Sequence, residues 1–144
     1  GQSSRLNQVK IKLSVIEENV RGKRVILIDD SIVRGTTSGL IVKLLKEAGA
    51  KEVHMRISSP PFLYPCYYGT DIDSSEHLIA CKHSIEEIGN IIGVDSLGYL
   101  PVNELKSLIN SEDYCSSCFD GNYPTKIPSD TRKDRFEKPL LKEK

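Results

Sequence analysis

The segment from Arg24 to Gly39, RVILIDDSIVRGTTSG, constrains the fold more than any other part of the chain. It starts with a short run of branched apolar residues, continues with two adjacent aspartates, and ends in a turn of small residues. A short apolar run between polar residues is typical of a buried strand in a parallel sheet. From about Thr37 the apolar residues recur at helical spacing until Gly49, a usual helix stop. The segment therefore predicts a strand, a tight turn and a helix.

Further strand and helix patterns follow along the chain. A second strand is predicted from Glu52 to Ser59, so strand, helix and strand form a βαβ unit. Ser84 and Glu87 form a capping-box pattern that starts a short helix, which Gly93 ends. The remaining predicted elements are a strand from Ser96 to Leu100 and a helix from Val102 to Ile109 with Asn103 as its N-cap. The predicted fold class is α/β, a parallel sheet flanked by helices.

The 144 residues suit one small domain. We divide the chain into a connector at residues 1–22, a structured body at 23–110 and a cysteine-containing tail at 111–144. The tail lacks a regular apolar pattern, so we expect it to be irregular, to wrap the surface and to be disordered near its end. The chain begins with Gly1 rather than Met, and we expect it to be part of a longer protein.

Composition gives no support to several classes of partner. Lys plus Arg and Asp plus Glu both number 20, so the net charge is zero and no strong attraction to nucleic acid or to a membrane surface is expected. No apolar run reaches the ~18–20 residues of a membrane span, and no secretory signal opens the chain. Four cysteines are too few for a disulfide scaffold. A cytoplasmic protein is predicted.

The turn at Gly35 to Gly39 has the composition of an anion site. Small residues let several backbone N–H groups and hydroxyls face one anion, and the dipole of the following helix adds attraction for a phosphate. The segment contains neither GxGxxG nor GxxxxGK followed by Ser or Thr. These absences weaken the hypotheses of a dehydrogenase and of a P-loop nucleotide-binding protein.

Asp29 and Asp30 lie where a parallel strand would present them to a ligand. Ionised carboxylates only accept hydrogen bonds, so the pair could bind the two hydroxyls of a ribose, or it could bind Mg²⁺ directly or through water. The alternative is a helix-capping aspartate beside a solvated one. For an isolated pair that alternative would be favoured, but the surrounding turn favours the ligand site.

These residues carry a family resemblance. Four apolar residues followed by DDSIVRGTTS resemble the phosphoribosyl pyrophosphate loop of type I phosphoribosyltransferases, and the unbroken loop is similar to that of the amidophosphoribosyltransferase family. Other segments similar to that family, in the same order, are RISSPP, YPCYYG, HLIA, HSIEEI and CFDGNYPT. The resemblance runs from Gly1 to about Thr131. It implies a partial type I phosphoribosyltransferase fold with an irregular C-terminal tail.

The resemblance also implies an activity. In the family, ammonia derived from glutamine attacks C1 of phosphoribosyl pyrophosphate, giving 5-phosphoribosylamine and pyrophosphate at the first step of de novo purine synthesis. An N-terminal glutaminase domain supplies the ammonia, purine nucleotides inhibit by feedback, and the enzyme is a homo-oligomer. Neither the glutaminase nucleophile nor the first strands of the transferase domain are recognised in this chain. We therefore expect the chain to be inactive by itself.

The family pattern assigns roles to individual residues. Asp29 and Asp30 would hold the ribose hydroxyls and Mg²⁺. The phosphate loop would consist of both aspartates with Ser31, Ile32, Val33, Arg34, Gly35, Thr36, Thr37 and Ser38. Arg34 would bind a phosphate oxygen or form a salt bridge. Lys12, at the end of the family's mobile loop, is the best candidate for a catalytic cation; Arg5 and Lys10 are weaker, and plain solvation is the alternative.

The cysteines resemble the iron–sulfur version of the family. Cys66, Cys115 and Cys118 match three ligand positions of a [4Fe-4S] cluster, whose fourth ligand would come from outside this chain. Cys81 matches no ligand position. A structural zinc or unligated thiols are the alternatives. We expect the cluster to have a structural role, because it would fasten the tail to the body.

Two other functions remain open at this stage. The same loop and fold could belong to a non-catalytic module that senses phosphoribosyl compounds or nucleotides. The thiols alone would also suit an interaction domain held together by zinc. His54, His77 and His83 are interpreted as ordinary surface or capping residues without a site role.

Overall fold

The computed structural model describes residues 14–72, 74–108 and 114–127. Within them, the strands β1 (Arg24–Asp29), β2 (Glu52–Ile57) and β3 (Ser96–Tyr99) form one sheet in the order β1-β2-β3. All pairs are parallel, with Arg24 opposite Glu52 and His54 opposite Ser96. The predicted α/β class with a parallel sheet is confirmed.

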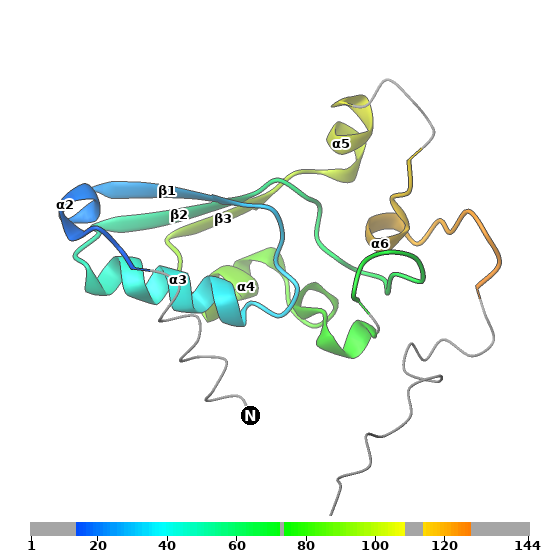
Figure 1. Ribbon diagram of the computed structural model, residues 1–144, viewed down its shortest axis with the longest axis horizontal. Helices are drawn as coiled ribbons and strands as arrows, with labels where there is room; N and C mark the ends of the chain where they lie inside the picture. The colour runs from blue at the N-terminus through cyan, green and yellow to red at the C-terminus, as the bar shows by residue number, and fades with distance from the viewer. Residues whose placement is uncertain (1–13, 73, 109–113, 128–144) are drawn as a thin grey trace, which may run out of the picture.

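Two helices cover one face of this sheet. The helix α3 (Thr36–Glu47) follows β1, and the helix α4 (Ile85–Ile92) precedes β3. Figure 1 shows both on the same side of the strands. Apolar side chains fill the space between them in two clusters, one around Val42, Leu45 and Val53 and the other around Met55, Ile88 and Ile92. Burial of these side chains supplies the main stabilisation of the body.

The opposite face of the sheet is open in the described part of the chain. Burial alternates along β1, and Ile26 and Ile28 on the open face are 68% and 74% exposed. Parallel sheets are almost always covered on both faces, because their strands carry apolar side chains on both sides. The two isoleucines of β1 are therefore apolar surface of the kind that is usually covered, whereas β2 carries polar side chains on the same face.

The predicted helix signals agree with the structure. Ser84 caps α4 through a complete capping box: its hydroxyl accepts from the Glu87 amide at 3.2 Å, and the Glu87 carboxylate accepts from the Ser84 amide at 2.7 Å. Gly93 ends α4 in the left-handed conformation, with φ of 81°. The strand β2 ends at Ile57, two residues earlier than predicted. Pro60 and Pro61 follow closely and lack the N–H groups that a longer ladder would need.

Other local predictions were wrong or incomplete. Helix α5 (Val102–Leu108) begins before Asn103, so Asn103 is not its N-cap; the Leu105 amide bonds to the Pro101 carbonyl at 2.9 Å, which puts Pro101 at that position. The elements without a clear periodic signal were not predicted, because each is a single turn: α2 (Glu17–Val20), η1 (Ser75–His77), η2 (Ile79–Cys81) and α6 (Ser117–Asp120).

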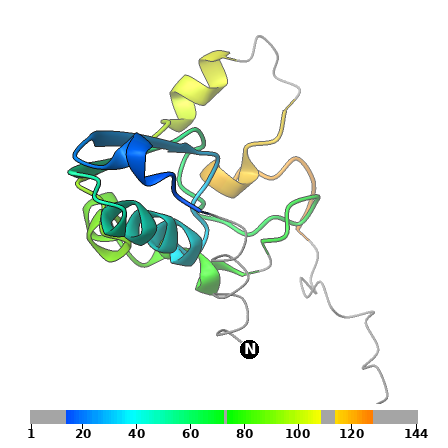
Figure 2. The ribbon, with the colours of Figure 1, turned by 60° about the vertical axis from the view of Figure 1, so that its left-hand side comes forward.

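The described part of the tail does more than wrap the surface. Ser116 and Ser117 are buried, and Phe119 packs on Phe62 with ring centroids 5.0 Å apart. In Figure 2, α6 lies beside the green loop segment that follows β2. A third apolar cluster forms there from Phe62, Cys66, Ile72 and Leu78, with Cys118 and Phe119 against it. The tail thus contributes to a small core of its own.

Among the described residues, the structure contains no helix with the length and hydropathy of a membrane span.

Candidate functional site

The usual position for ligands in a parallel sheet, the carboxyl end of its strands, is formed here by β1 and the turn after it. Figure 1 shows all three strands running toward the end of the sheet where α5 and α6 lie. Asp29 is the last residue of β1, and residues 30–35 form the turn into α3. The structure therefore brings the predicted aspartate pair and the predicted phosphate turn into one continuous strand–turn–helix unit.

The two aspartates differ in environment. Asp29 is half-buried and its Oδ1 accepts a hydrogen bond from the Asp30 amide at 3.0 Å, whereas Asp30 is exposed and its Oδ1 accepts from the Ser31 hydroxyl at 3.3 Å. Burial raises the pKa of Asp29, and the charge of Asp30 adds to this, although the Asp30 amide acts in the opposite direction. A cation or a pair of hydroxyl donors beside the carboxylates would relieve both effects.

The start of α3 is prepared for an anion. Its N-cap position is Gly35, with φ of 77°, so no side chain caps the helix, and its first turn contains no acidic residue. The first described helical bond joins the Gly39 amide to the Gly35 carbonyl at 2.9 Å. The amides of residues 36–38 therefore remain available as donors, at the positive end of the helix dipole.

Gly35 is needed at this turn for two reasons. A residue with a side chain is strained at its positive φ, and a Cβ would also lie 2.9 Å from Cδ1 of Ile79. A hydrogen bond also joins Ile79 to the turn, since its amide donates to the Val33 carbonyl at 2.9 Å. The turn is thus held by the η2 segment as well as by its own sequence.

The predicted loop residues divide into anchors and ligand-facing candidates. Ile32 is 2% exposed in the main core, and Val33 packs on the third apolar cluster. The Ser38 side chain is buried as well, at 4%. Thr36 and Thr37 are exposed. The buried members can offer a phosphate only their backbone amides, whereas the two threonines can also offer hydroxyls.

Arg34 is an exposed residue of the turn. It lines a cavity of about 300 Å³ together with Glu76, His77, Leu78, Ile79, Lys82, His83 and Ile91. Within the described ranges no ion pair involves Arg34, so the salt bridge considered as its alternative role has no partner in this part of the chain. Lys12, with Arg5 and Lys10, lies outside the described residues.

The three predicted cluster cysteines line one cavity. It measures about 260 Å³ and is lined by Cys66, Tyr68, Gly69, Thr70, Cys115, Ser117, Cys118 and Pro124. Cys66 comes from the segment after β2, and the other two thiols come from the tail about fifty residues later. All four cysteines of the chain are free thiols, and Cys81 lies outside this cavity.

Backbone amides surround the Cys66 sulfur. Burial acts to raise the pKa of this thiol, but the amides of Tyr68, Thr70 and Gly69, with the Thr70 side chain, outweigh burial and lower the pKa. The Thr70 amide lies 3.4 Å from the sulfur. Successive amides that converge on one atom form a nest, an arrangement that stabilises anions and is common at iron–sulfur sites.

Cys118 has the opposite electrostatic character. Burial raises the pKa of its thiol to about 11, and the neighbouring Cys66 and Cys115 add to the rise. Three thiolates here would therefore repel one another unless a positive centre lay between them. In the part of the chain that the structure describes, no three His, Cys, Asp or Glu side chains are grouped to hold a single metal ion.

The tail is docked by contacts between protein groups. The amides of Leu63 and Tyr64 both donate to the Cys118 carbonyl, at 3.0 and 3.1 Å. The Tyr123 hydroxyl donates to the Pro65 carbonyl at 2.7 Å, and Lys106 pairs with Asp120 at 2.8 Å. These contacts hold the tail against the segment after β2 and so place its two cysteines beside Cys66.

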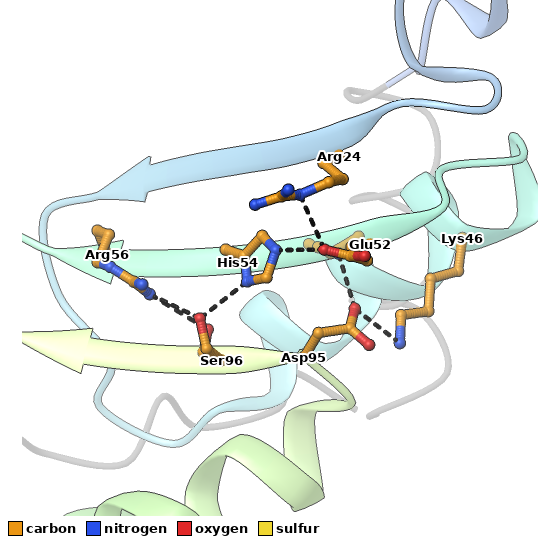
Figure 3. Close-up of polar contacts among 8 residues, drawn as sticks. Arg24, Lys46, Glu52, His54, Arg56, Asp95 and Ser96 are labelled. Carbon is orange, nitrogen blue, oxygen red and sulfur yellow. Dashed lines mark hydrogen bonds and ion pairs between the residues drawn. The ribbon is translucent and has the colours of Figure 1, made fainter.

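A chain of polar contacts runs across the open face of the sheet, as Figure 3 shows. Glu52 pairs with Arg24 at 3.0 Å and with His54 Nε2 at 2.9 Å. His54 Nδ1 lies 2.9 Å from the Ser96 hydroxyl, to which Arg56 donates at 3.1 Å. His54 is therefore neither a plain surface residue nor a cap, but the centre of a network that links all three strands.

Sequence reasoning did not identify several residues around the cysteine cavity. Tyr68, Gly69 and Thr70 contribute the amides at Cys66, and Ser117 lies 3.1 Å from the Cys115 sulfur. A glycine three residues after a cysteine is a local signal only in that glycine lets the backbone approach a neighbouring group closely. Ser117 has no comparable signal, because its position depends on how the tail docks.

Comparison with known proteins extends this picture. An amidophosphoribosyltransferase from Archaeoglobus fulgidus is 52% identical to this chain over 133 residues, which are 90% of this chain and 29% of that protein. This chain is homologous to the C-terminal part of amidophosphoribosyltransferases. The resemblance expected from DDSIVRGTTS is thereby confirmed. No family model matches the chain.

Two solved structures have the same fold as this chain. One, described as glutamine phosphoribosylpyrophosphate amidotransferase from B. subtilis complexed with ADP and GMP, has 51% identity and a TM-score of 0.73 over 81% of this chain and 27% of that chain. The other, described as the allosteric regulatory enzyme of purine biosynthesis, has 47% identity and a TM-score of 0.78 over 90% and 29%. The predicted phosphoribosyltransferase-type fold is confirmed.

The chain spans less than a third of the length of the curated relatives it matches. Plant relatives are named chloroplastic amidophosphoribosyltransferases.

Proposed function

We propose that this chain carries the phosphoribosyl-binding part of an amidophosphoribosyltransferase, an enzyme that makes 5-phosphoribosylamine for purine synthesis. The observation that carries the proposal is the uncapped start of α3 directly after the aspartate pair at the end of β1. This arrangement offers phosphate donors and ribose acceptors within one turn of chain. The homology to amidophosphoribosyltransferases supports the choice of reaction.

The proposed reaction is a displacement at C1 of the ribose. A bond forms between ammonia nitrogen and C1, the bond from C1 to the pyrophosphate oxygen breaks, and pyrophosphate leaves with the bonding electrons. Positive charge develops on the sugar, so the carboxylates of Asp29 and Asp30 stabilise the transition state. The amides of residues 36–38, with the hydroxyls of Thr36 and Thr37, hold the 5-phosphate. No nucleophile from this chain is required.

The aspartate pair fits a Mg²⁺ ion that arrives with the substrate. Mg²⁺ prefers carboxylate and phosphate oxygens and keeps several waters, and Asp30 is exposed, with its carboxylate accepting from the Ser31 hydroxyl beside it. The ion would neutralise the leaving pyrophosphate. Asp29 and Asp30 would hold it together with the ribose hydroxyls, and the raised pKa of Asp29 would fall in its presence.

The test uses the complete enzyme that carries this chain. With phosphoribosyl pyrophosphate, Mg²⁺ and ammonium, we expect ammonia-dependent release of pyrophosphate, and omission of ammonium should abolish it. The alternative, a non-catalytic sensor, is favoured by one observation, the ADP and GMP bound in the B. subtilis relative. Tight binding of ADP or GMP without any pyrophosphate release would contradict the enzyme and support the sensor.

The cysteine cavity is proposed to hold a [4Fe-4S] cluster through Cys66, Cys115 and Cys118. The cavity volume, the amides at Cys66 and the repulsion that three thiolates would have for one another support a cationic group bound between the sulfurs. The fourth ligand would come from the rest of the enzyme. After anaerobic purification, iron and acid-labile sulfide in equal amounts would support the cluster, whereas zinc without iron would support a structural zinc site.

Further partners follow from the same proposal. The rest of the transferase domain would cover the open face of the sheet, where Ile26, Ile28 and Arg56 are exposed. An N-terminal glutaminase domain would supply ammonia, Lys12 would contribute a cation toward the pyrophosphate, and purine nucleotides would inhibit the enzyme. We also propose a homo-oligomer in the cytoplasm. Cross-linking of the complete enzyme and cell fractionation test these last two points.

A further inference from the structure

Ser117, the first residue of α6, occupies a special position at the wall of the cysteine cavity. Its side chain is 2% exposed, and its hydroxyl oxygen lies 3.1 Å from the Cys115 sulfur and 2.7 Å from the Asn122 carbonyl oxygen. Ser116 beside it is almost as buried, at 8%, but its hydroxyl donates to Asp120 at 2.8 Å. Both serines are buried and both donate a hydrogen bond, but of the two hydroxyls only that of Ser117 contacts a sulfur.

Which group donates in the contact between Ser117 and Cys115 depends on whether Cys115 is a free thiol or is bound to a metal. A serine hydroxyl has one proton to donate and can also accept. With a free thiol, the Cys115 S–H donates to Ser117 and the Ser117 O–H donates to Asn122, so every polar group is satisfied. A thiolate that binds a metal has no proton. The lone pairs of Ser117 would then face a negative sulfur unless the hydroxyl turned its proton toward it.

The energetics favour that rotation. Hydrogen bonds to an ionised acceptor are roughly twice as strong as those between neutral groups. The carbonyl that Ser117 would leave belongs to Asn122, an exposed residue, in a partly buried hydrogen bond; a water bound at that carbonyl would replace the lost donor. The Asn122 amide keeps its own bond to Asp120 at 3.0 Å, and the turn after α6 is held in place.

We propose that Ser117 donates its hydroxyl proton to the Cys115 sulfur when that sulfur binds the cluster, and that it acts as a positioning residue which favours the reduced cluster. This inference rests on the proposed [4Fe-4S] site. Hydrogen bonds to the sulfurs are among the factors that set cluster potentials, and a donor stabilises the more negative reduced form. Loss of a group that supports a metal ligand typically weakens metal binding about 10- to 100-fold.

The test compares three variants of the complete enzyme after anaerobic reconstitution with iron and sulfide. In Ser117→Ala we expect a lower reduction potential, measured by a dye-mediated titration followed by electron paramagnetic resonance, and about 10-fold faster iron release to a chelator. Ser117→Thr retains a hydroxyl and should restore both values toward the wild type. Ser116→Ala removes the hydroxyl of a serine that is almost as buried but has no sulfur contact, so its cluster should keep the wild-type potential.

Three outcomes would overturn the proposal, and they can be told apart. A Ser117→Ala protein that holds a full cluster with the wild-type potential and release rate would refute the role of Ser117 and leave the cluster itself standing. A wild-type enzyme that takes up no iron would refute the cluster and the role of Ser117 together. Equal shifts in Ser116→Ala and Ser117→Ala would show a general packing effect, and this too would overturn the proposal.

Discussion

The phosphate loop and the cysteine cavity are built in opposite ways. The loop is one continuous stretch, residues 29–38, in which a strand end, a glycine turn and a helix start follow directly from the local sequence. The cavity joins residues 66–70 to residues 115–124, two segments that come together only through packing and hydrogen bonds between them. Local chemistry therefore determines the first site, and tertiary docking determines the second.

Because the cysteine cavity depends on docking, the contacts that attach the tail to the segment after β2 are part of the site. The cluster is expected to fasten the tail, and protein contacts act in the same direction, since the Cys118 carbonyl accepts from the amides of Leu63 and Tyr64. The Lys106–Asp120 ion pair and the Tyr123–Pro65 hydrogen bond add two further attachments. Contacts of this kind reduce the conformational entropy that the two segments would lose when their thiols bind one metal group.

The largest effect is expected from the phosphate loop. Replacing both carboxylates in Asp29→Asn/Asp30→Asn should lower kcat/KM of the complete enzyme for phosphoribosyl pyrophosphate by about 100-fold or more, the usual size when a preorganised electrostatic contact is removed. The thermal stability should change little, because Asp30 is exposed and the side-chain oxygen of an asparagine in place of Asp29 can still accept from the next amide. Steady-state pyrophosphate release measures the effect.

Glu47→Gln is the matched control for this pair. Glu47 is an exposed carboxylate on the same helix unit, and its ion pair with Lys43 spans 3.8 Å. It should retain wild-type kcat/KM. If kcat/KM of the aspartate double variant stayed within threefold of the wild-type value, the two carboxylates would have no role in the reaction. The loop would then not be the substrate site that distinguishes it from the cysteine cavity.

The turn itself should be the next most sensitive feature. In Gly35→Ala, the positive φ costs about 1–2 kcal/mol, and the Cβ 2.9 Å from Ile79 adds about 1–3 kcal/mol of overpacking. We expect a loss of about 3 kcal/mol in the free energy of unfolding, measured for this chain by urea denaturation with far-ultraviolet circular dichroism.

Gly22→Ala separates the two contributions. Gly22 also has a positive φ, 70°, but nothing lies within 4 Å of a Cβ there. Its loss should therefore be only about 1–2 kcal/mol. Equal losses of unfolding free energy in Gly35→Ala and Gly22→Ala would mean that the contact between the turn and Ile79 does not constrain the loop.

The phosphate loop could be predicted from the sequence to a greater extent than the cysteine cavity. The strand, the aspartates and the helix start were predictable because each has a local signal within about ten residues. The burial of Ile32 could not be predicted, because it depends on core residues that are distant in sequence. The start of α5 was predicted incorrectly at Asn103, because the position of an N-cap depends on the exact first residue of the helix. Ser117 illustrates the limit most clearly: CSSC contains two serines, and only docking decides which one meets the sulfur.

Acid should affect the tail more than the loop. Although burial opposes it, hydrogen bonds from Lys106, the Asn122 amide and Ser116 lower the pKa of Asp120 to about 2. A depressed pKa stabilises the fold above the ordinary value of 3.8, and this stabilisation is lost as the pH falls from there through 2. The difference corresponds to about 2 kcal/mol.

Tyrosine circular dichroism in the near-ultraviolet can follow this transition, because the chain has six Tyr and no Trp and the Tyr67 and Tyr123 rings pack 5.0 Å apart. Asp120→Asn should loosen the tail at neutral pH and remove most of the change between about pH 4 and 2. Glu87→Gln, a carboxylate of the α4 capping box with a lowered pKa of its own, should leave the tyrosine signal of the tail unchanged. An Asp120→Asn protein with the full wild-type acid transition would refute this role.

The smallest effect concerns two tyrosines that both link the tail to the segment after β2. Tyr123 donates to the Pro65 carbonyl at 2.7 Å in a partly buried contact, whereas Tyr68 meets Thr125 at 3.0 Å in an exposed one. Loss of the hydroxyl in Tyr123→Phe leaves a carbonyl without its donor and should cost about 1 kcal/mol. In Tyr68→Phe water replaces the partner, and the cost should be close to zero.

Thiol labelling at neutral pH can detect this difference in the metal-free protein. Cys118 reacts when the tail opens, so a loss of about 1 kcal/mol should raise its alkylation rate about fivefold in Tyr123→Phe, with little change in Tyr68→Phe. Mass spectrometry separates Cys118 from the exposed Cys81 and Cys115. Equal rates in both variants would mean that the tail opens without breaking the buried contact, and docking of the cavity would then depend on the backbone bonds at Cys118 and the Asp120 ion pair.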